Sequence, residues 1–237
     1  MKILVACEES QAVTKALRKL NHEAYSCDLL PCSGGHPEWH FKNDVFEIIK
    51  HNGGTLENGE KVKGSSKWDM MIAHPPCTYL AVSGARWMYD PKDAHLPTNE
   101  RAEHPRFEGR RLLQIEAIEF VKRLWNNRIP KVAIENPIGV LSTKWKKPNQ
   151  IVHPYHFGDE ASKATCLWLR GLPKLQHTNV VGKGERVQLA SGKSLPKWYS
   201  DALTKAKSAE ERRTLRSKTF DGLAEAMATQ WTKNIEV

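Results

Sequence analysis

The sequence predicts an α/β protein with a doubly wound, mostly parallel sheet, and three observations lead to this fold class. Short apolar runs, such as residues 3–6 and 68–73, are typical of strands that are buried on both faces. Apolar residues at helical spacing over residues 10–20 and 108–125 predict helices that alternate with the strands. The strand runs end abruptly, in carboxylates or prolines. Sheets of this kind bind ligands at the carboxyl ends of their strands.

The first elements follow each other closely. Residues 3–6 form a predicted strand, and Ser10 is expected to cap a helix that runs to Leu20. Residues 23–28 form a second strand that ends in a carboxylate, Asp28. This order is that of the first half of a doubly wound sheet.

The next stretch contains loops and one further strand. Residues 31–40 form a loop rich in Pro, Gly and His, and a short helix is expected over residues 44–50. Residues 51–67 are rich in Gly, Asn and Lys, which indicates an exposed hairpin or loop. The strand at residues 68–73 then ends in a His-Pro-Pro-Cys sequence, where the prolines terminate regular pairing.

The second half continues the alternation. Residues 90–107 are polar, contain three prolines and have the composition of a mobile active-site loop. Two further strands are expected, at residues 131–135 and 165–169, and a last short helix at residues 222–231. The helix at residues 108–125 is predicted to be amphipathic, with one apolar side formed by Leu112, Ile115, Ile118, Val121 and Leu124.

Composition narrows the choice of partners. The chain has 237 residues, with 36 Lys and Arg against 27 Asp and Glu, so its formal net charge is +9. This excess suggests a polyanionic partner such as nucleic acid. No apolar run is long enough to span a bilayer, and the first apolar run is too short for a signal peptide. The five cysteines, an odd number, argue against a disulfide framework. We therefore expect a cytoplasmic protein without a membrane partner.

Cys77 is the first candidate for chemistry. The strand at residues 68–73 feeds a Pro75-Pro76-Cys77 turn, which projects the cysteine at the carboxyl edge of the sheet. A cysteine there can act as a nucleophile if its pKa is lowered or if a proton acceptor is near. The alternative is a small buried residue in a proline turn.

Glu135 is the second candidate. It ends the strand at residues 131–135 and is followed by Asn136 and Pro137. Attack by a thiolate on carbon 6 of a pyrimidine becomes easier if an acid protonates, or hydrogen-bonds to, ring nitrogen N3. A glutamate does that, and it also reads the exocyclic amine of cytosine. The alternative is a turn or helix-capping carboxylate.

These two motifs, in this order and with a helix between them, resemble the DNA cytosine carbon-5 methyltransferase family. Pro76-Cys77 with Ser83-Gly84, and Glu135-Asn136-Pro137, are similar to its two central motifs. The resemblance implies the Rossmann-like fold of class I S-adenosylmethionine-dependent methyltransferases. It implies that Cys77 attacks carbon 6 of a cytosine flipped out of DNA, that Glu135 engages N3, and that carbon 5 takes the methyl group. A compact enzyme of this pattern suits a bacterium or a phage-infected host.

The resemblance also implies a cofactor site. Asp28 matches an acidic residue that takes the ribose hydroxyls, Asp44 resembles one near the adenine, and Pro75 borders the site. The family has a glycine-rich turn after the first strand, whereas this chain has Cys7, Glu8 and Ser10 there. Glu8 could oppose a cofactor carboxylate or meet its ammonium group. Either aspartate could instead be a simple cap.

Two later segments extend the resemblance with departures. The stretch before residues 165–169 lacks the family's Gln and both Arg, and Lys163 and Thr165 are candidates for their roles beside the base. Lys163 could also be merely solvated. Residues 216–228 resemble the closing motif, with Ser217 and Thr219 as polar contacts to the cofactor.

One constellation lies outside the family pattern. Cys27, Cys32, His36 and His40 have a spacing that could hold zinc or another transition metal. Cys27, however, lies in a predicted strand and must point away from Asp28. We therefore expect no metal, and a rigid loop that roofs the cofactor or substrate pocket.

The domain organisation follows from the resemblance. Residues 1–170 form the catalytic domain, residues 171–216 a small basic insertion in the place of a target-recognition region, and residues 217–237 a helix that returns to the catalytic domain. Basic residues in the insertion would contact phosphates, and Trp198 and Tyr199 could stack on bases. A solvated helical hairpin is the alternative. Two rival functions remain: an enzyme that installs another carbon-5 group or acts on free nucleotides, and a non-catalytic DNA-binding relative.

Overall fold

A seven-stranded sheet organises the structure. The computed structural model describes residues 1–233 and gives the sheet order β3-β2-β1-β6-β7-β9-β8. Two short hairpins lie outside this sheet in the described part of the chain, β4 (Gly54–Thr55) with β5 (Lys61–Val62) and β10 (Arg186–Gln188) with β11 (Ser194–Pro196). The sheet strands are β1 (Lys2–Ala6), β2 (Glu23–Asp28), β3 (His40–Lys42), β6 (Met70–Ala73), β7 (Lys131–Pro137), β8 (Gln150–Val152) and β9 (Thr165–Arg170).

The strand order confirms the doubly wound fold. β3, β2, β1, β6 and β7 run parallel, and the chain winds outward from β1 to β3 before it crosses to the other side of β1 with β6. β9 is antiparallel to both of its neighbours, β7 and β8. Without β9, the strands follow the order 3-2-1-4-5-6 of a Rossmann-like sheet. The chain therefore has an α/β, Rossmann-like fold with one inserted antiparallel strand.

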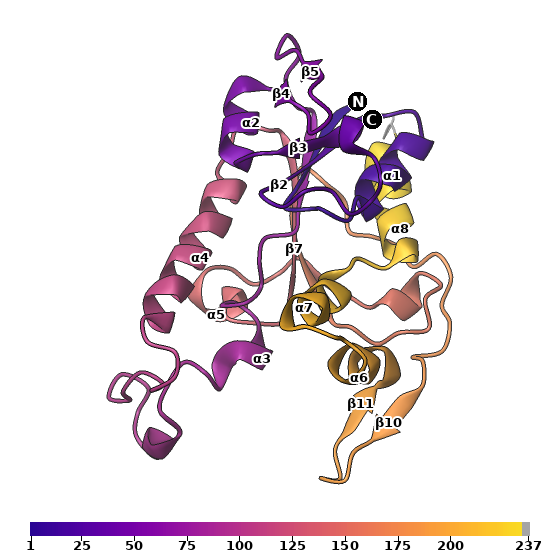
Figure 1. Cartoon of the computed structure of the whole chain (residues 1–237). Coiled ribbons are helices and arrows are strands. Elements are labelled where there is room, and N and C mark those ends of the chain that lie inside the picture. Colours follow the sequence, from indigo (N-terminus) through magenta and orange to yellow (C-terminus); the bar gives the residue numbers. More distant parts are fainter. Residues whose placement is uncertain (234–237) are drawn as a thin grey trace.

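Helices cover both faces of the sheet (Figure 1). α1 (Ala12–Lys19) and α8 (Asp221–Thr232) pack against each other and share one apolar cluster with β1 and β6. α2 (Val45–His51), α4 (Arg110–Trp125) and α5 (Leu141–Lys144) share the cluster on the opposite face. The C-terminal helix thus lies against the first helix, and residues 234–237 of the predicted C-terminal segment lie outside the described residues. Within residues 1–233, no helix is both long and apolar enough to cross a membrane.

Two covered faces explain the apolar run at residues 3–6. β1 and β6 are buried along their whole lengths. Successive side chains of a strand point to opposite faces, so Ile3 and Val5 join the cluster under α1 and α8, and Leu4 and Ala6 join the other cluster. A strand with both faces covered favours apolar residues at successive positions, as at residues 3–6.

The start of α1 differs from the prediction. Ser10 is not the cap, because Gln11 occupies that position in a left-handed conformation with φ of 57°. The Glu8 carboxylate does the capping, since it accepts the backbone N–H groups of Val13 at 2.6 Å and Thr14 at 3.2 Å. A tight turn at Cys7, with φ of 58°, places Glu8 under the helix start.

The predicted apolar side of α4 is only half correct. Ile118, Val121 and Leu124 are buried, but Leu112 and Ile115 are 60% and 56% exposed. The first half of α4 extends toward the end of the molecule that carries α3 (Val82–Ala85) (Figure 1), and Leu112 and Ile115 are exposed to solvent in this half. The sequence pattern also missed β3, β8, β10 and β11, because segments of three residues are too short to display a periodicity.

The carboxyl edge of the parallel strands is the crowded end of the molecule. α3, α6 (Lys197–Thr204), α7 (Ala209–Ser217) and the β10–β11 hairpin all lie at this end, the lower end in Figure 1. β1 and β6 are adjacent, and the chain winds in opposite directions from them. Such a switch point opens a crevice at the carboxyl ends, where doubly wound proteins bind ligands.

Arg170 ties the end of α4 to the sheet, and its loss should destabilise the fold. Its guanidinium donates to the carbonyl of Trp125 and to those of Asn127 and Ile129, at 3.0 and 2.7 Å. We expect Arg170→Met to lower the free energy of unfolding by about 2–4 kcal/mol, because part-buried carbonyls lose a charged donor. Urea denaturation measures the change. The exposed neighbour Arg128 is the control, since Arg128→Met should change stability by less than about 0.5 kcal/mol. Equal losses would contradict this role of Arg170.

Candidate functional site

The carboxyl edge brings together polar side chains from three neighbouring strands. Glu8 follows β1, His74 follows β6, and Glu135 lies within β7. His74 Nδ1 is 3.0 Å from Glu135 Oε2, and the two side chains are only 10% and 11% exposed. This contact joins residues that are far apart in sequence, because β6 and β7 are paired in the sheet. The carboxyl edge next to the switch point therefore holds a buried imidazole–carboxylate pair.

The surroundings favour the charged form of both partners. Burial raises the pKa of Glu135, but the hydrogen bond and charge of His74, with the charge of Lys163, outweigh it and hold the pKa below its usual value. Burial lowers the pKa of His74, and Lys163 also opposes its charge, yet Glu135 and Glu8 raise that pKa above its usual value. A low-dielectric site favours a charged pair only when the charges are close and hydrogen-bonded.

Glu8 is fixed from the other side. Besides the two backbone N–H groups of α1, its carboxylate accepts the hydroxyl of Thr14 at 2.7 Å. Burial raises the pKa of Glu8, while His74 and the bonds from Thr14 and Val13 act against this rise. The carboxylate therefore uses the first amide groups of α1 that a ligand would otherwise meet.

Cys77 lies half-buried in the turn after β6, and its thiol is protonated at rest. Burial raises its pKa, the negative charge of Glu135 raises it further, and the positive charges of Lys163 and Arg216 act in the opposite direction. The backbone carbonyl of Cys77 accepts the N–H groups of Leu80 and Ala81, which closes the turn. The thiol becomes a nucleophile only when the balance of these charges changes.

Asn136 holds the proline turn in place. Its side-chain Nδ2 donates to the carbonyl of Pro75 at 2.7 Å, and the residue is almost fully buried. This bond joins β7 directly to the segment that carries His74 and Cys77. Its side-chain oxygen Oδ1 is buried without a hydrogen-bond partner among the described residues.

Lys163 and Thr165 lie at the end of β9 that borders the site. Lys163 donates to the carbonyl of Lys218 at 3.2 Å and acts electrostatically on His74, Cys77 and Glu135, so it is more than a solvated lysine. Thr165 is buried opposite Pro137 of β7.

The two polar candidates for cofactor contacts near the C-terminus, Ser217 and Thr219, flank the residue that contacts Lys163. Ser217 ends α7 and donates its hydroxyl to the carbonyl of Thr214 at 3.1 Å. Thr219 is buried in the following link to α8. Both flank Lys218, whose carbonyl holds Lys163.

The predicted acidic residues gather around Cys7. Burial raises the pKa of the Cys7 thiol well above its usual value, and the charges of Asp28 and Asp44 add to this rise. Asp28 Oδ1 accepts the N–H of Leu30 at 2.9 Å, and Asp44 Oδ1 accepts that of Phe46 at 2.8 Å as the cap of α2. Ser10 is half-buried in the same turn. Both aspartates therefore have local capping roles and also border the end of β1.

The four possible metal ligands do not converge. Cys27 donates to the carbonyl of Asn43, and His40 contacts Ser26 and the carbonyl of Leu30. His36 pairs instead with Glu38 at 2.9 Å. Within residues 1–233, no three His, Cys, Asp or Glu side chains are arranged to hold a metal ion. All five cysteines are free thiols.

The loop at residues 31–40 is anchored by Gln11. The side chain of Gln11 donates to the carbonyl of His36 at 2.8 Å and accepts its N–H at 3.1 Å. The loop is thus tied to the turn between β1 and α1.

Two residues of the site were not singled out from the sequence. His74 ends the β6 segment, and its position beside two prolines at a sheet edge is a weak signal. Arg216 lies at the end of α7, over the ring of Tyr199 at 4.8 Å, with a buried Nε that has no hydrogen-bond partner among the described residues. Its influence on Cys77 depends on how the C-terminal segment folds back, which no local pattern reveals.

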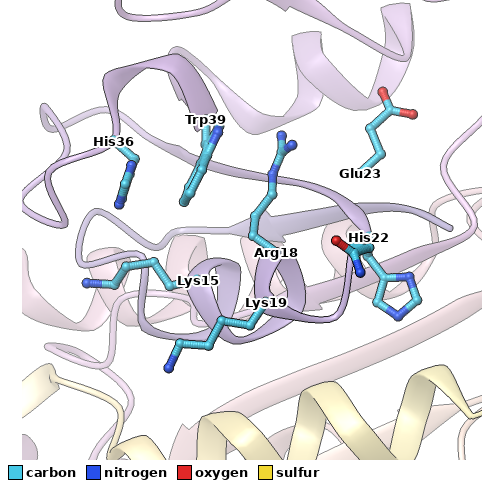
Figure 2. Close-up of a pocket in the computed structure, with 8 residues that line it drawn as sticks. Lys15, Arg18, Lys19, His22, Glu23, His36 and Trp39 are labelled. Atoms are coloured by element: carbon cyan, nitrogen blue, oxygen red, sulfur yellow. The ribbon is translucent and has the colours of Figure 1, made fainter.

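A separate cavity lies on the outer side of α1. It has a volume of about 690 Å³ and is lined by residues that include Lys15, Arg18, Glu23, His36 and Trp39. Figure 2 shows the rings of His36 and Trp39 side by side near Arg18 and Lys15, and the two rings stack at 3.8 Å. Glu23 begins β2, so this cavity reaches the edge of the sheet opposite to Glu135. It is not part of the candidate site.

Comparisons with known proteins give a distant structural likeness. No family model matches the chain, and no curated protein matches it in sequence. Among solved structures, it is similar to a prophage-encoded Escherichia coli protein named as a DNA modification methyltransferase, with a TM-score of 0.38 and 12% identity over 70% of this chain and 45% of that one. It is also similar to the Entamoeba histolytica methyltransferase EhMeth, with a TM-score of 0.37 and 12% identity over 86% of this chain and 64% of that one. The chain thus spans less than two thirds of either protein, and we carry over no residue role.

The buried pair predicts how stability depends on pH. The contribution of Glu135 to folding stability is fully present above the usual pKa of a glutamate. It is lost as pH falls through the lowered pKa that Glu135 has in the folded protein. The contribution of His74 to folding stability is fully present below the usual pKa of a histidine. It is lost as pH rises through the raised pKa that His74 has in the folded protein. We therefore expect the stability difference between wild type and Glu135→Gln to be largest between about pH 4.3 and 6.5. Denaturant unfolding across pH measures it. Glu47→Gln, which breaks the exposed pair with His51, is the control and should show little pH-dependent difference.

Asn136 gives a second prediction. Asn136→Asp replaces the donor to Pro75 with an acceptor, close to the Glu135 carboxylate, so we expect about 3 kcal/mol or more of destabilisation. Asn136→Ala should cost less, about 1–3 kcal/mol, because it removes the bond without adding a charge. Thermal and urea unfolding of both variants measure which one loses more stability. An Asn136→Asp protein as stable as wild type would refute the prediction.

Proposed function

We propose that the protein is a DNA cytosine carbon-5 methyltransferase in which Cys77 bonds covalently to carbon 6 of the target base. One observation carries this proposal: Cys77 follows β6 and Glu135 lies in the neighbouring parallel strand β7, at the same edge of the sheet. The negative charge of Glu135 raises the pKa of Cys77, as expected for groups that lie near each other. A nucleophile and a carboxylate at one edge can address two atoms of a single pyrimidine ring.

The roles of the two residues follow from proton bookkeeping. Cys77 gives up its thiol proton to solvent water, and its sulfur forms a bond to carbon 6 while electron density moves toward N3 and carbon 5. Glu135 stabilises this change by holding a proton at N3. Later, loss of the carbon-5 proton to a base lets the sulfur–carbon bond break and returns the cysteine. Asn136 fixes the position of the Cys77 turn relative to Glu135 through its hydrogen bond to the carbonyl of Pro75.

The charges around Cys77 support activation by the substrate. The negative charge of Glu135 opposes thiolate formation, whereas Lys163 and Arg216 favour it. When Glu135 shares a proton with N3, its charge is partly neutralised and its opposition falls. The thiol would then ionise only when a pyrimidine is in place, which protects the nucleophile in the free enzyme.

The acidic residues around Cys7 fit S-adenosylmethionine. Asp28, at the end of β2, could accept the ribose hydroxyls, and Asp44 lies close enough to border the adenine side. Pro75, Ser10, Ser217 and Thr219 are the further polar or shape-defining candidates around this end of the sheet. When bound, S-adenosylmethionine would supply the methyl group for carbon 5. Glu8 occupies the first amides of α1, so the methionine part would meet the carboxylate of Glu8 and the imidazole of His74 there.

The basic C-terminal segment supports a DNA substrate. We assign residues 1–170 to catalysis and residues 171–216 to target recognition, with α8 closing the catalytic domain. α6, α7 and the β10–β11 hairpin lie at the carboxyl edge, next to the site (Figure 1). Trp198 packs on Phe220 and Tyr199 lies under Arg216, so these two rings support the segment from within. Phosphate contacts by its lysines and arginines would then dominate affinity, and the cytosine must be flipped out to reach Cys77.

Glu8 occupies the first backbone N–H groups of α1, and this favours an alternative to S-adenosylmethionine-dependent methylation of DNA. A helix start that is already neutralised by Glu8 is a poor site for a cofactor carboxylate. The same covalent chemistry with another one-carbon donor, or on a free pyrimidine nucleotide, fits this turn. Mass spectrometry of nucleosides from cells that express the protein separates these products by the mass added at carbon 5.

Transfer of a labelled methyl group to DNA tests the proposal. We expect wild type to label cytosine-containing duplex DNA, and Cys77→Ala to lose at least about a thousandfold in rate. Glu135→Gln should lose about a hundredfold or more, because it cannot deliver a proton to N3.

Cys32→Ala is the matched control, since Cys32 is a half-buried thiol in the loop at residues 31–40 and should keep wild-type activity. If wild type labels neither duplex DNA, single-stranded DNA nor nucleotides, the methyltransferase assignment is wrong. If it binds DNA tightly without any reaction, a non-catalytic DNA-binding protein is favoured.

A further inference from the structure

His74 is a buried titratable group that the covalent mechanism above leaves without a role. Its Nδ1 lies 3.0 Å from Glu135 Oε2, and its side chain is only 10% exposed. Its other ring nitrogen, Nε2, is buried and has no hydrogen-bond partner among the described residues. A buried nitrogen of this kind is costly unless it serves a ligand or an ordered water.

The charges that face His74 come from three other elements. Glu8 approaches from the turn between β1 and α1, Glu135 from β7, and Lys163 from the segment before β9. Cys77, on the same turn as His74, is neutral at rest. Glu135 and Glu8 raise the pKa of His74 against the effects of burial and of Lys163, so the cluster favours the protonated imidazole.

Glu135 alone cannot perform the step that the proposed function asks of it. A carboxyl group whose pKa is held below its usual value carries no proton near neutral pH. N3 of cytosine nevertheless needs a proton as the sulfur attacks carbon 6. The hydrogen bond from His74 Nδ1 ends on the same carboxylate that faces the base, so a proton source lies one bond away.

We propose that His74 stores the proton that Glu135 delivers to N3 of the target pyrimidine. The inference rests on the proposed function. The His74 Nδ1–H bond breaks as a Glu135 O–H bond forms, and this O–H bond then breaks as the N3–H bond forms. Glu135 ends as it began, His74 becomes neutral with its hydrogen on Nε2, and N3 holds the proton. When the cysteine leaves, the proton returns by the same path.

His74 is thus a positioning residue that also sets the protonation of Glu135. In the neutral form the hydrogen stays on Nε2, which has no hydrogen-bond partner among the described residues. The arrangement also explains why the site places an imidazole between Glu8 and Glu135 instead of a second amide like Asn136. An amide could orient Glu135 but could not lend it a proton.

The test compares His74→Asn with wild type in methyl transfer across pH. Asparagine can place an N–H near the position of Nδ1 and so keep Glu135 oriented, but it cannot give up a proton. We expect kcat to fall about a hundredfold near neutral pH with KM for DNA changed less than about twofold. In wild type, kcat should decline as pH rises through the raised pKa of His74, and this decline should vanish in His74→Asn. His51→Asn is the matched control, because His51 also pairs with a glutamate, Glu47, but on the exposed side of α2.

A second measurement does not depend on activity. Nitrogen-15 NMR titration of the free protein should show a His74 imidazole with a raised pKa in wild type and a lower pKa in Glu135→Gln. A His74→Asn enzyme with wild-type rate and pH profile would overturn the proton-store role and leave the methyltransferase assignment intact. So would a His74 that is neutral throughout the range in which wild type is active. Absence of any transfer by wild type would overturn both proposals.

Discussion

The ion pair between His74 and Glu135 constrains the whole carboxyl edge of the sheet. Glu135 lies in β7, whose residues Val132 to Asn136 are all buried, and a lone carboxylate there would cost several kcal/mol. The imidazole of His74 removes this cost only at hydrogen-bond distance, so the end of β6 must stay beside β7. The bond from Asn136 to Pro75 enforces the same alignment. Because Cys77 follows on this turn, its position is a consequence of satisfying a buried charge.

His74 also connects this pair electrostatically to the first half of the Rossmann-like fold. Glu8 belongs to the β1–α1 turn, its carboxylate caps α1, and its charge raises the pKa of His74. The site is therefore a chain of charges, from the α1 N-terminus through His74 and Glu135 to Lys163. Lys163 in turn is held by the carbonyl of Lys218 in the C-terminal segment. A change in protonation at any of these groups shifts the others, which is the property that acid–base chemistry at one edge requires.

Sequence patterns and the structure agree where local signals are strong. The buried strands at β1, β6 and β7, the loop hairpin at β4 and β5, and the last helix were all predicted, because apolar periodicity and turn residues act locally. The pattern failed at Leu112 and Ile115, which are exposed to solvent in the first half of α4. It also named Ser10 as a cap, although the backbone turn at Cys7 gives that role to Glu8.

The sequence by itself determined that a cysteine and a carboxylate lie at the ends of two buried strands, since Pro76-Cys77 and Glu135-Asn136 come just after apolar runs. It could not determine that His74 reaches Glu135, that the charge of Glu8 acts on His74, or that Arg216 returns to act on Cys77. Those contacts join residues from separate elements, and only the strand order and the fold of the C-terminal segment bring them together. Their energy arises in a low-dielectric crevice that does not exist until the sheet has formed, so no local pattern records it.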